Sequence, residues 1–129
     1  MSMNDSLEVV ASSWFTAEVR ALPRLHRDRI DSKVATFTRK GWSAAMGDQT
    51  IKPLRDGIYE LRVLGRGAAF RLLFFVMPGL SPRLVVLTTC ALTSDMLKQQ
   101  RMEAEIDRAI KRRGEWMEQR RKEEVNDEG

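Results

Sequence analysis

Residues 58–77, which read IYELRVLGRGAAFRLLFFVM, decide the fold of this 129-residue chain. From residue 58 to residue 64 the side chains alternate between two faces, which is typical of a half-buried strand. The glycines of Gly65-Arg66-Gly67 predict a turn. Residues 70–77 are apolar apart from Arg71, as expected for a central strand. This stretch therefore predicts a β-hairpin.

The segments on either side of this hairpin extend it into a sheet. Pro78 to Pro82 predicts a second turn, and Leu84–Thr89 is rich in the branched residues that favour strands. We therefore expect a three-stranded antiparallel meander over residues 57–90. A further short strand is predicted at Leu7–Ala11, near the start of the chain.

Helical patterns flank the meander. Residues 13–22 and 24–40 carry apolar residues at helical spacing and are separated by Pro23, so they predict a helical hairpin. Residues 42–52 are expected to form a connecting loop. After Ser94 the pattern becomes helical again, and the apolar residues that repeat every fourth position should pack on the sheet: Met102, Ile106 and Ile110.

Length and composition fit one folded domain. The chain has 129 residues, of which 43% are hydrophobic, so it can build one core. We predict an α+β fold: a small antiparallel sheet, made of the N-terminal strand and the meander, with an N-terminal helical hairpin and a C-terminal helix. The domain is expected to cover residues 1–117. Residues 118–129 are almost wholly charged and are predicted to be a disordered tail.

Several classes of site are excluded by residue counts. Cys90 is the only cysteine and His26 the only histidine, so an intrachain disulfide and a zinc site built from several cysteines or histidines are impossible. We expect no metal. No apolar run approaches the roughly 18–20 residues needed to span a bilayer, and the first 30 residues lack the features of a signal peptide. A cytoplasmic location with no membrane association is the expectation.

Positive charge is concentrated in the middle of the chain. Between Arg20 and Arg83 there are 13 basic and five acidic residues, a balance of +8, whereas the whole chain carries +4. Such a stretch can bind phosphate backbones. It can equally be a solvated surface that maintains solubility, and charge alone leaves both interpretations open.

Arg62 and Arg71 interrupt otherwise apolar strands, where an unpaired charge is costly to bury. If the turn is a four-residue loop, the two face each other with Cβ atoms about 4.5–5.5 Å apart. An anion or carboxylate must then lie between them. A three-residue loop would place them on opposite faces. The alternative is that Arg62 pairs with Glu60 or Glu18, or is simply exposed.

Two further cations bracket Pro53 and Leu54 just before the first strand of the hairpin. Lys52 and Arg55 could add charge to one edge of the same anion site. An ordinary solvated loop is the alternative.

The run KPLRDGIYELR at residues 52–62, followed by FRLLFF at residues 70–75, resembles the RelE/ParE superfamily of toxins. It is most similar to the phage-derived HigB-like branch. The resemblance implies a RelE-like fold and a small ribonuclease toxin that cleaves messenger RNA on the ribosome. It also implies pairing with a helix-turn-helix antitoxin, and it requires no metal or other cofactor.

The resemblance also suggests site residues. Arg62 and Arg71 match the strand arginines of the family and inherit the role of gripping phosphate, with Lys52 as a further catalytic candidate. We assign RNA contacts to the other nearby cations: Arg55, Arg66, Lys98 and Arg101.

The sequence departs from the family pattern after its last strand. Relatives usually carry a pair of basic residues there. In this chain residues 88–95 contain no basic residue, and the first basic residues that follow are Lys98 and Arg101. The general acid or base is therefore not identified. Lys98, Arg101 and Tyr59 are candidates, although the alternation of Tyr59 with Leu61 favours a core position for Tyr59. Two other functions stay open: a ParE-like toxin that binds a topoisomerase, and a non-catalytic basic module that binds nucleic acid or a partner protein.

Overall fold

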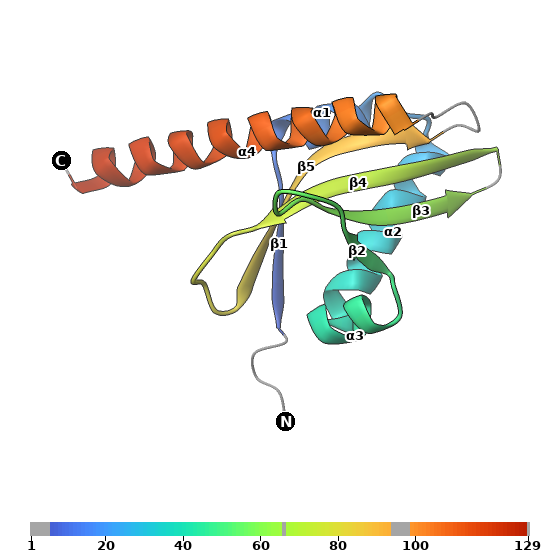
Figure 1. Ribbon diagram of the computed structural model, residues 1–129, viewed down its shortest axis with the longest axis horizontal. Coiled ribbons are helices and arrows are strands. Elements are labelled where there is room, and N and C mark those ends of the chain that lie inside the picture. The colour runs from blue at the N-terminus through green and yellow to red at the C-terminus, as the bar shows by residue number, and fades with distance from the viewer. Residues whose placement is uncertain (1–5, 66, 94–98, 129) are drawn as a thin grey trace.

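The computed structural model describes residues 6–65, 67–93 and 99–128, which form five strands and four helices (Figure 1). The strands are β1 (Leu7–Ala11), β2 (Ile51–Pro53), β3 (Tyr59–Gly65), β4 (Ala68–Val76) and β5 (Arg83–Thr93). The helices are α1 (Ser13–Arg20), α2 (Arg24–Lys40), α3 (Trp42–Gly47) and α4 (Gln99–Glu128). This α+β arrangement confirms the predicted fold class and is compatible with a RelE-like fold.

All five strands form one sheet in the order β1-β5-β4-β3-β2. The pairs from β2 to β5 are antiparallel, which confirms the meander, but β1 runs parallel to β5. The sheet is therefore mixed, where the sequence predicted an antiparallel one. The direction of β1 is set by a long connection through the helices and not by a hairpin, so the alternation of side chains does not encode it.

The segment predicted as a loop at residues 42–52 contains α3 and β2. Ala45 of α3 and Ile51 of β2 are both buried. Ile51 pairs with Leu61 of β3, which adds a fifth, very short strand to the edge of the sheet. Both elements are too short to show a period in the sequence, which is why they escaped prediction.

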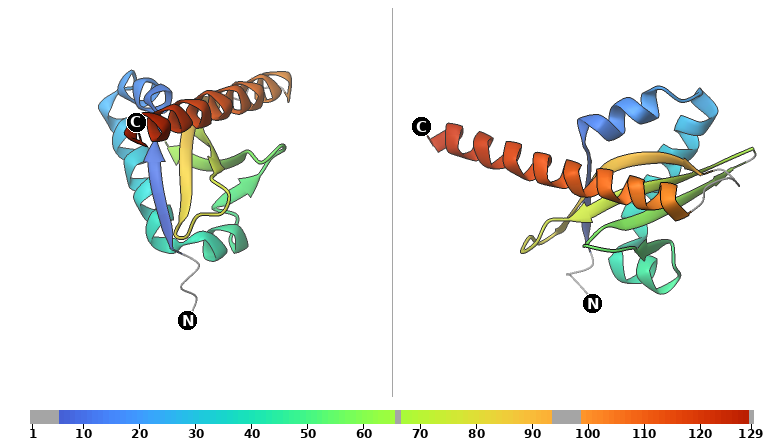
Figure 2. Two further views of the ribbon diagram at one scale, coloured as in Figure 1. Left: turned by 90° about the vertical axis from the view of Figure 1, so that its left-hand side faces the viewer. Right: turned by 45° about the horizontal axis from the view of Figure 1, so that its top comes forward.

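The sheet has an apolar core on each face. Helices α1, α2 and α3 cover one face, where Phe15, Ile30 and Phe37 pack against residues such as Leu61 and Phe74. Helix α4 crosses the other face, and Figure 2 shows the sheet between it and α2. The ring of His26 lies edge-on to Phe70, with 5.3 Å between ring centroids. Because both faces are covered, β4 and β5 carry apolar side chains on both sides.

Helix α4 packs on the sheet, as the sequence predicted. Ile106 is buried, and Met102 and Ile110 pack beside it on the second core. The helix continues through Gly114 and on to Glu128, where we expected it to give way to a disordered tail. Glutamate, glutamine, arginine and lysine are all good helix formers. Pairs such as Arg121–Glu118, at 2.8 Å, add support within the charged segment.

Among the described residues, no helix has the length and apolar character required to cross a membrane.

We predict that Ile106→Ala lowers the free energy of unfolding by about 2–4 kcal/mol, because it removes buried methyl groups and leaves a cavity between α4 and the sheet. Val125 lies on the same helix and is exposed, so Val125→Ala should change it by less than about 0.5 kcal/mol. Urea unfolding followed by circular dichroism measures both. Equal effects of the two substitutions would show that α4 does not pack on the sheet in solution.

Candidate functional site

Arg62 of β3 and Arg71 of β4 are direct cross-strand partners. The register continues through Leu64 and Ala69 to Gly65 and Ala68. It is the register that the four-residue loop predicted, and the turn uses Gly67 with φ of 75°, a conformation that glycine adopts without strain. Both arginines therefore emerge on the same face of the sheet, the one that α4 crosses.

The carboxylate of Glu60 lies between these two guanidinium groups. Its Oε1 is 3.4 Å from Arg62 Nε and its Oε2 is 3.3 Å from Arg71 Nη1. The Glu60 side chain is only 3% exposed, so this carboxylate is a buried counter-charge that allows two like charges to stand opposite each other. The predicted anion between the arginines is thus supplied by the protein itself, and the pairing of Arg62 with Glu60 is also present.

The hydrogen bonds of this cluster are incomplete. Among the described residues, Glu60 Oε2 and Arg71 Nε are buried without a hydrogen-bond partner, although Oε2 lies within ion-pair distance of Arg71. Buried polar atoms without partners are rare, and each calls for an explanation such as a functional role or a bound water or ion. The cluster therefore has unused capacity to donate and accept hydrogen bonds.

The two arginines differ in their access to solvent. Arg62 is 55% exposed, whereas Arg71 is 23% exposed and its Nη1 lies 3.2 Å from Met102 Sδ of α4. Helix α4 thus covers part of Arg71 and leaves Arg62 open. A ligand would reach the pair from the side of β2 and β3.

Lys52 joins this cluster from β2. It is the cross-strand partner of Glu60 and is exposed. A small cleft of about 70 Å³ lies beside it, lined by Gln49, Thr50, Lys52, Glu60 and Arg62. The structure therefore brings together the three residues proposed as catalytic: Lys52, Arg62 and Arg71.

Arg55 has a different environment. Its Nε is 2.7 Å from Glu103 Oε2, its Nη2 is 2.7 Å from Asp107 Oδ1 and its Nη1 is 2.8 Å from Asp56 Oδ2. Asp107, Asp56 and Glu103 together raise the pKa of the Arg55 guanidinium above its usual range. In this conformation Arg55 anchors α4 to the turn before β3, and its RNA contact stays a prediction.

Of the four remaining candidate residues, the structure describes Arg101 and Tyr59. Arg101 is exposed on the first turn of α4, whereas Arg66 and Lys98 lie outside the described residues. Tyr59, a candidate acid or base, packs on the opposite face of the sheet, with its ring 5.1 Å from that of Trp42 and 5.4 Å from that of Phe74. The core position that its alternation with Leu61 favoured is therefore confirmed, and the sheet separates its ring from both arginines.

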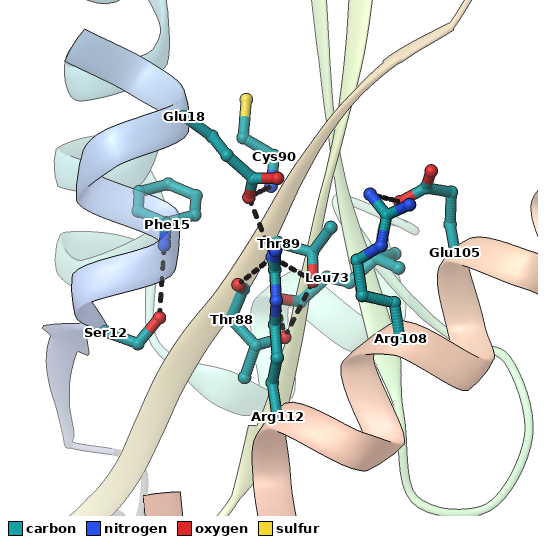
Figure 3. Close-up of polar contacts among 10 residues, drawn as sticks. All are labelled: Ser12, Phe15, Glu18, Leu73, Thr88, Thr89, Cys90, Glu105, Arg108 and Arg112. Carbon is teal, nitrogen blue, oxygen red and sulfur yellow. Dashed lines mark hydrogen bonds and ion pairs between the residues drawn. The ribbon is translucent and has the colours of Figure 1, made fainter. Parts of the chain in front are cut away.

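A second polar cluster, centred on Arg112 of α4, was missed by the sequence analysis (Figure 3). Arg112 Nη1 donates to Glu18 Oε1 and to the carbonyl oxygen of Thr88, both at 2.9 Å. Thr88 is the extra residue of a β-bulge, since Leu73 pairs with Thr89 whereas Phe74 pairs with Leu87. The bulge turns the Thr88 carbonyl away from the ladder, and Arg112 satisfies it while tying α4 to α1 and β5.

One sequence signal could have pointed to Arg112. It lies four residues after Arg108, at the border of the apolar stripe formed by Ile106 and Ala109. Long cationic side chains in such positions cover apolar surface and reach polar groups beyond it. Its partners, Glu18 and Thr88, are distant in the sequence and could not have been assigned.

Cys90 adjoins this cluster. Its backbone N–H donates to Glu18 Oε1 at 3.1 Å. Burial, reinforced by the negative charge of Glu18, raises the pKa of the Cys90 thiol to about 12. The thiol is therefore protonated at neutral pH, and Cys90 is a poor nucleophile.

The fold is compatible with the superfamily that the sequence resembles. The sequence model of the family described as "Phage derived protein Gp49-like (DUF891)" matches residues 17–114. The chain belongs to this phage-derived Gp49-like family, a family in the RelE/ParE-like toxin superfamily. Searches of curated proteins and of solved structures gave no significant match.

We predict that Glu60→Gln lowers the free energy of unfolding by about 1–3 kcal/mol, because it leaves two opposed guanidinium groups without their buried counter-charge. In the double variant with Arg71→Met the loss should be smaller than the sum of the single losses, with a coupling of about 1 kcal/mol or more. The exposed helix pair Glu118 and Arg121 is the matched control, with an expected coupling below about 0.5 kcal/mol. Equal couplings would contradict a special role for Glu60.

We also predict that the Cys90 thiol resists alkylation. With a pKa of about 12 against an ordinary 9.0, its thiolate fraction at pH 8 is about a thousandfold lower than in the unfolded chain. Iodoacetamide labelling followed by mass spectrometry, in buffer and in concentrated urea, measures the ratio of rates. Similar rates in both conditions would refute the raised pKa.

The same shift gives a pH dependence of stability. The folded chain holds the thiol proton more tightly than the unfolded chain, so this contribution to stability is complete below about pH 9 and falls as the pH rises toward 12. The free energy of unfolding of the Cys90→Ala variant should therefore fall less between pH 9 and pH 12 than that of the wild type.

Proposed function

We propose that the chain is the toxin of a type II toxin–antitoxin system, similar to the HigB-like branch, and that it cleaves messenger RNA on the ribosome. The observation that carries this proposal is the opposed pair Arg62 and Arg71, held by a buried carboxylate and joined by Lys52. Membership of a family in the RelE/ParE-like superfamily supports it.

The chemistry would proceed without a cofactor. The ribose 2′-oxygen loses its proton and attacks the adjacent phosphorus, and the bond from phosphorus to the 5′-oxygen breaks as that oxygen takes up a proton. The products are a 2′,3′-cyclic phosphate and a free 5′-hydroxyl. Negative charge builds on the phosphoryl oxygens in the transition state, where preorganised cations stabilise it.

Arg62 and Arg71 suit this task. Guanidinium groups stay protonated and can hold two phosphate oxygens through parallel hydrogen bonds. Because the two residues are direct partners on adjacent strands, both can approach one phosphate. Lys52, opposite Glu60 on the next strand, adds a third positive charge on the open side.

Glu60 acts as a positioning residue in this proposal. Its buried Oε2 has no direct path to a substrate hydroxyl, but its two oxygens fix the two guanidinium groups. A rigid pair loses little freedom when the transition state forms, which is the advantage of a preorganised site.

The partner would be a helix-turn-helix antitoxin that is acidic where it touches this chain. The balance of +8 between residues 20 and 83 supports this part of the proposal. Complementary charge speeds association and makes it dependent on salt.

A non-catalytic binding module is the second candidate. The described part of β5 after Thr88 contains no basic side chain. The guanidinium of Arg112 lies beside Thr88, but it is already paired with the carboxylate of Glu18. Both observations favour binding without cleavage, so the test must separate binding from cutting.

We predict that Arg71→Ala reduces cleavage of ribosome-bound messenger RNA by about 10²–10³-fold, because one phosphate-holding cation is lost. Arg39 is an exposed cation on α2 away from the pair, so Arg39→Ala should cleave like the wild type. Single-turnover cleavage by purified chains, together with mapping of transcript 5′ ends after induction in bacteria, measures the effect. Thermal unfolding confirms that both variants are folded.

The outcomes separate the functions. New 5′ ends with the wild type and their loss with Arg71→Ala support the endonuclease. Growth arrest without new 5′ ends, accompanied by inhibited DNA supercoiling, would assign the chain to the ParE-like toxins. Normal growth with no new ends would leave the non-catalytic module and overturn the proposal.

A further inference from the structure

A groove of about 730 Å³ runs between α2 and the outer edge of β3. It exists because β2 pairs only with residues 59–61 of β3. In the part of the chain that the structure describes, residues 62–65 of β3 therefore have no strand on that side. Helix α2 forms one wall, the turn at residues 48–50 closes one end, and Arg62 to Leu64 form the other wall.

The groove is continuous with the candidate site. Gln49, Thr50 and Arg62 line both the groove and the small cleft that holds Lys52 and Glu60. A chain-like ligand with one phosphate at the arginine pair could therefore continue into the groove without leaving the protein surface.

The free charge of the groove is positive. Arg29 and Lys33 lie four residues apart on α2 and line it, and neither has an ion pair among the described residues. Each acidic residue of the lining has a cationic partner outside the groove, since Asp28 lies 3.8 Å from Arg24 and Asp48 lies 2.5 Å from Lys40. Two cations on α2 thus face the groove in addition to Arg62.

Arg29 is also held at the strand edge. A Cβ built on Gly65 would lie only 1.9 Å from Arg29 Nη1, so the guanidinium rests against the backbone of Gly65. Any larger residue at position 65 would displace it. The backbone at the end of β3 therefore holds the Arg29 guanidinium in place.

We infer that this groove binds single-stranded RNA, holding the sugar–phosphate backbone on one side of the cleaved bond. The inference deepens the proposed function and rests on it. Three cations are available for backbone phosphates: Arg29, Lys33 and Arg62. The hydroxyl and amide groups of Ser32, Thr36, Gln49 and Thr50 can bond sugars and bases. Continuity with the arginine pair favours RNA over an acidic protein segment, which the test includes as the other occupant.

The test measures binding with a ligand that cannot be cut. A fluorescein-labelled oligouridylate of about 12 nucleotides, 2′-O-methylated throughout, keeps its phosphates but lacks the attacking hydroxyl. Fluorescence anisotropy gives its affinity for the full chain over a range of salt concentrations. The double variant Arg29→Ala, Lys33→Ala is compared with the wild type and with the control Arg20→Ala, Lys122→Ala, which removes two exposed cations outside the groove.

We expect the groove variant to bind about 10–100-fold more weakly at low salt, with the control within about twofold of the wild type. Each lost phosphate contact should also make the slope of log affinity against log salt less steep by about 0.7. The slope of the groove variant should therefore be less steep than that of the wild type by about 1.4. Gly65→Ala, which displaces Arg29 but removes no charge, should weaken binding in the same direction. Thermal unfolding confirms that each variant is folded.

The inference is overturned if the wild type does not bind, or if the groove variant matches the control in affinity and in slope. It is also overturned if a peptide of about ten glutamates binds and depends on Arg29 and Lys33 while the RNA does not. That result would assign the groove to an acidic protein. Because the probe cannot be cleaved, failure of the endonuclease proposal leaves this measurement intact, and failure of the groove leaves the cleavage assay intact.

Discussion

The carboxylate of Glu60, enclosed between the guanidinium groups of Arg62 and Arg71, makes the rest of the site possible. Two like charges directly opposite on neighbouring strands repel each other. A single buried carboxylate shared between them offsets that repulsion and holds both guanidinium groups in place. The cluster remains positive overall, since two guanidinium groups share one carboxylate. An added phosphate would therefore meet a surface that is both preorganised and attractive, which is the combination that transition-state stabilisation requires.

Helix α4 determines the side from which that surface is reached. Arginines fix it at separate points: Arg55 binds Glu103 and Asp107, Arg113 donates to the carbonyl of Asp56, and Arg112 caps the bulge in β5. These contacts supplement a narrow apolar stripe and hold Met102 over Arg71. The helix thus closes one approach to the pair, and the open approach lies toward β2 and the groove along α2.

The sequence predicted what depends on local pattern. The register of Arg62 with Arg71 was one of two alternatives, because the turn chemistry of residues 65–68 limits the loop length. The parallel direction of β1 depends on a crossover of some 70 residues, and no local pattern encodes it. The same applies to Arg112, whose partner Glu18 is 94 positions away. Tyr59 shows the converse: its alternation with Leu61 indicated a core position, and the structure places it there.

The open edge of β3 follows from one small turn. Asp48 accepts hydrogen bonds from the backbone N–H of Thr50, at 2.9 Å, and from Lys40, and Gln49 has φ of 63°. This turn keeps the chain away from β3 until Ile51, so β2 is too short to cover Arg62. An exposed strand edge invites unwanted pairing with other chains. Here Arg62 and the guanidinium of Arg29 against Gly65 place charge on that edge, so the same two cations that discourage strand pairing also make it suitable for phosphate.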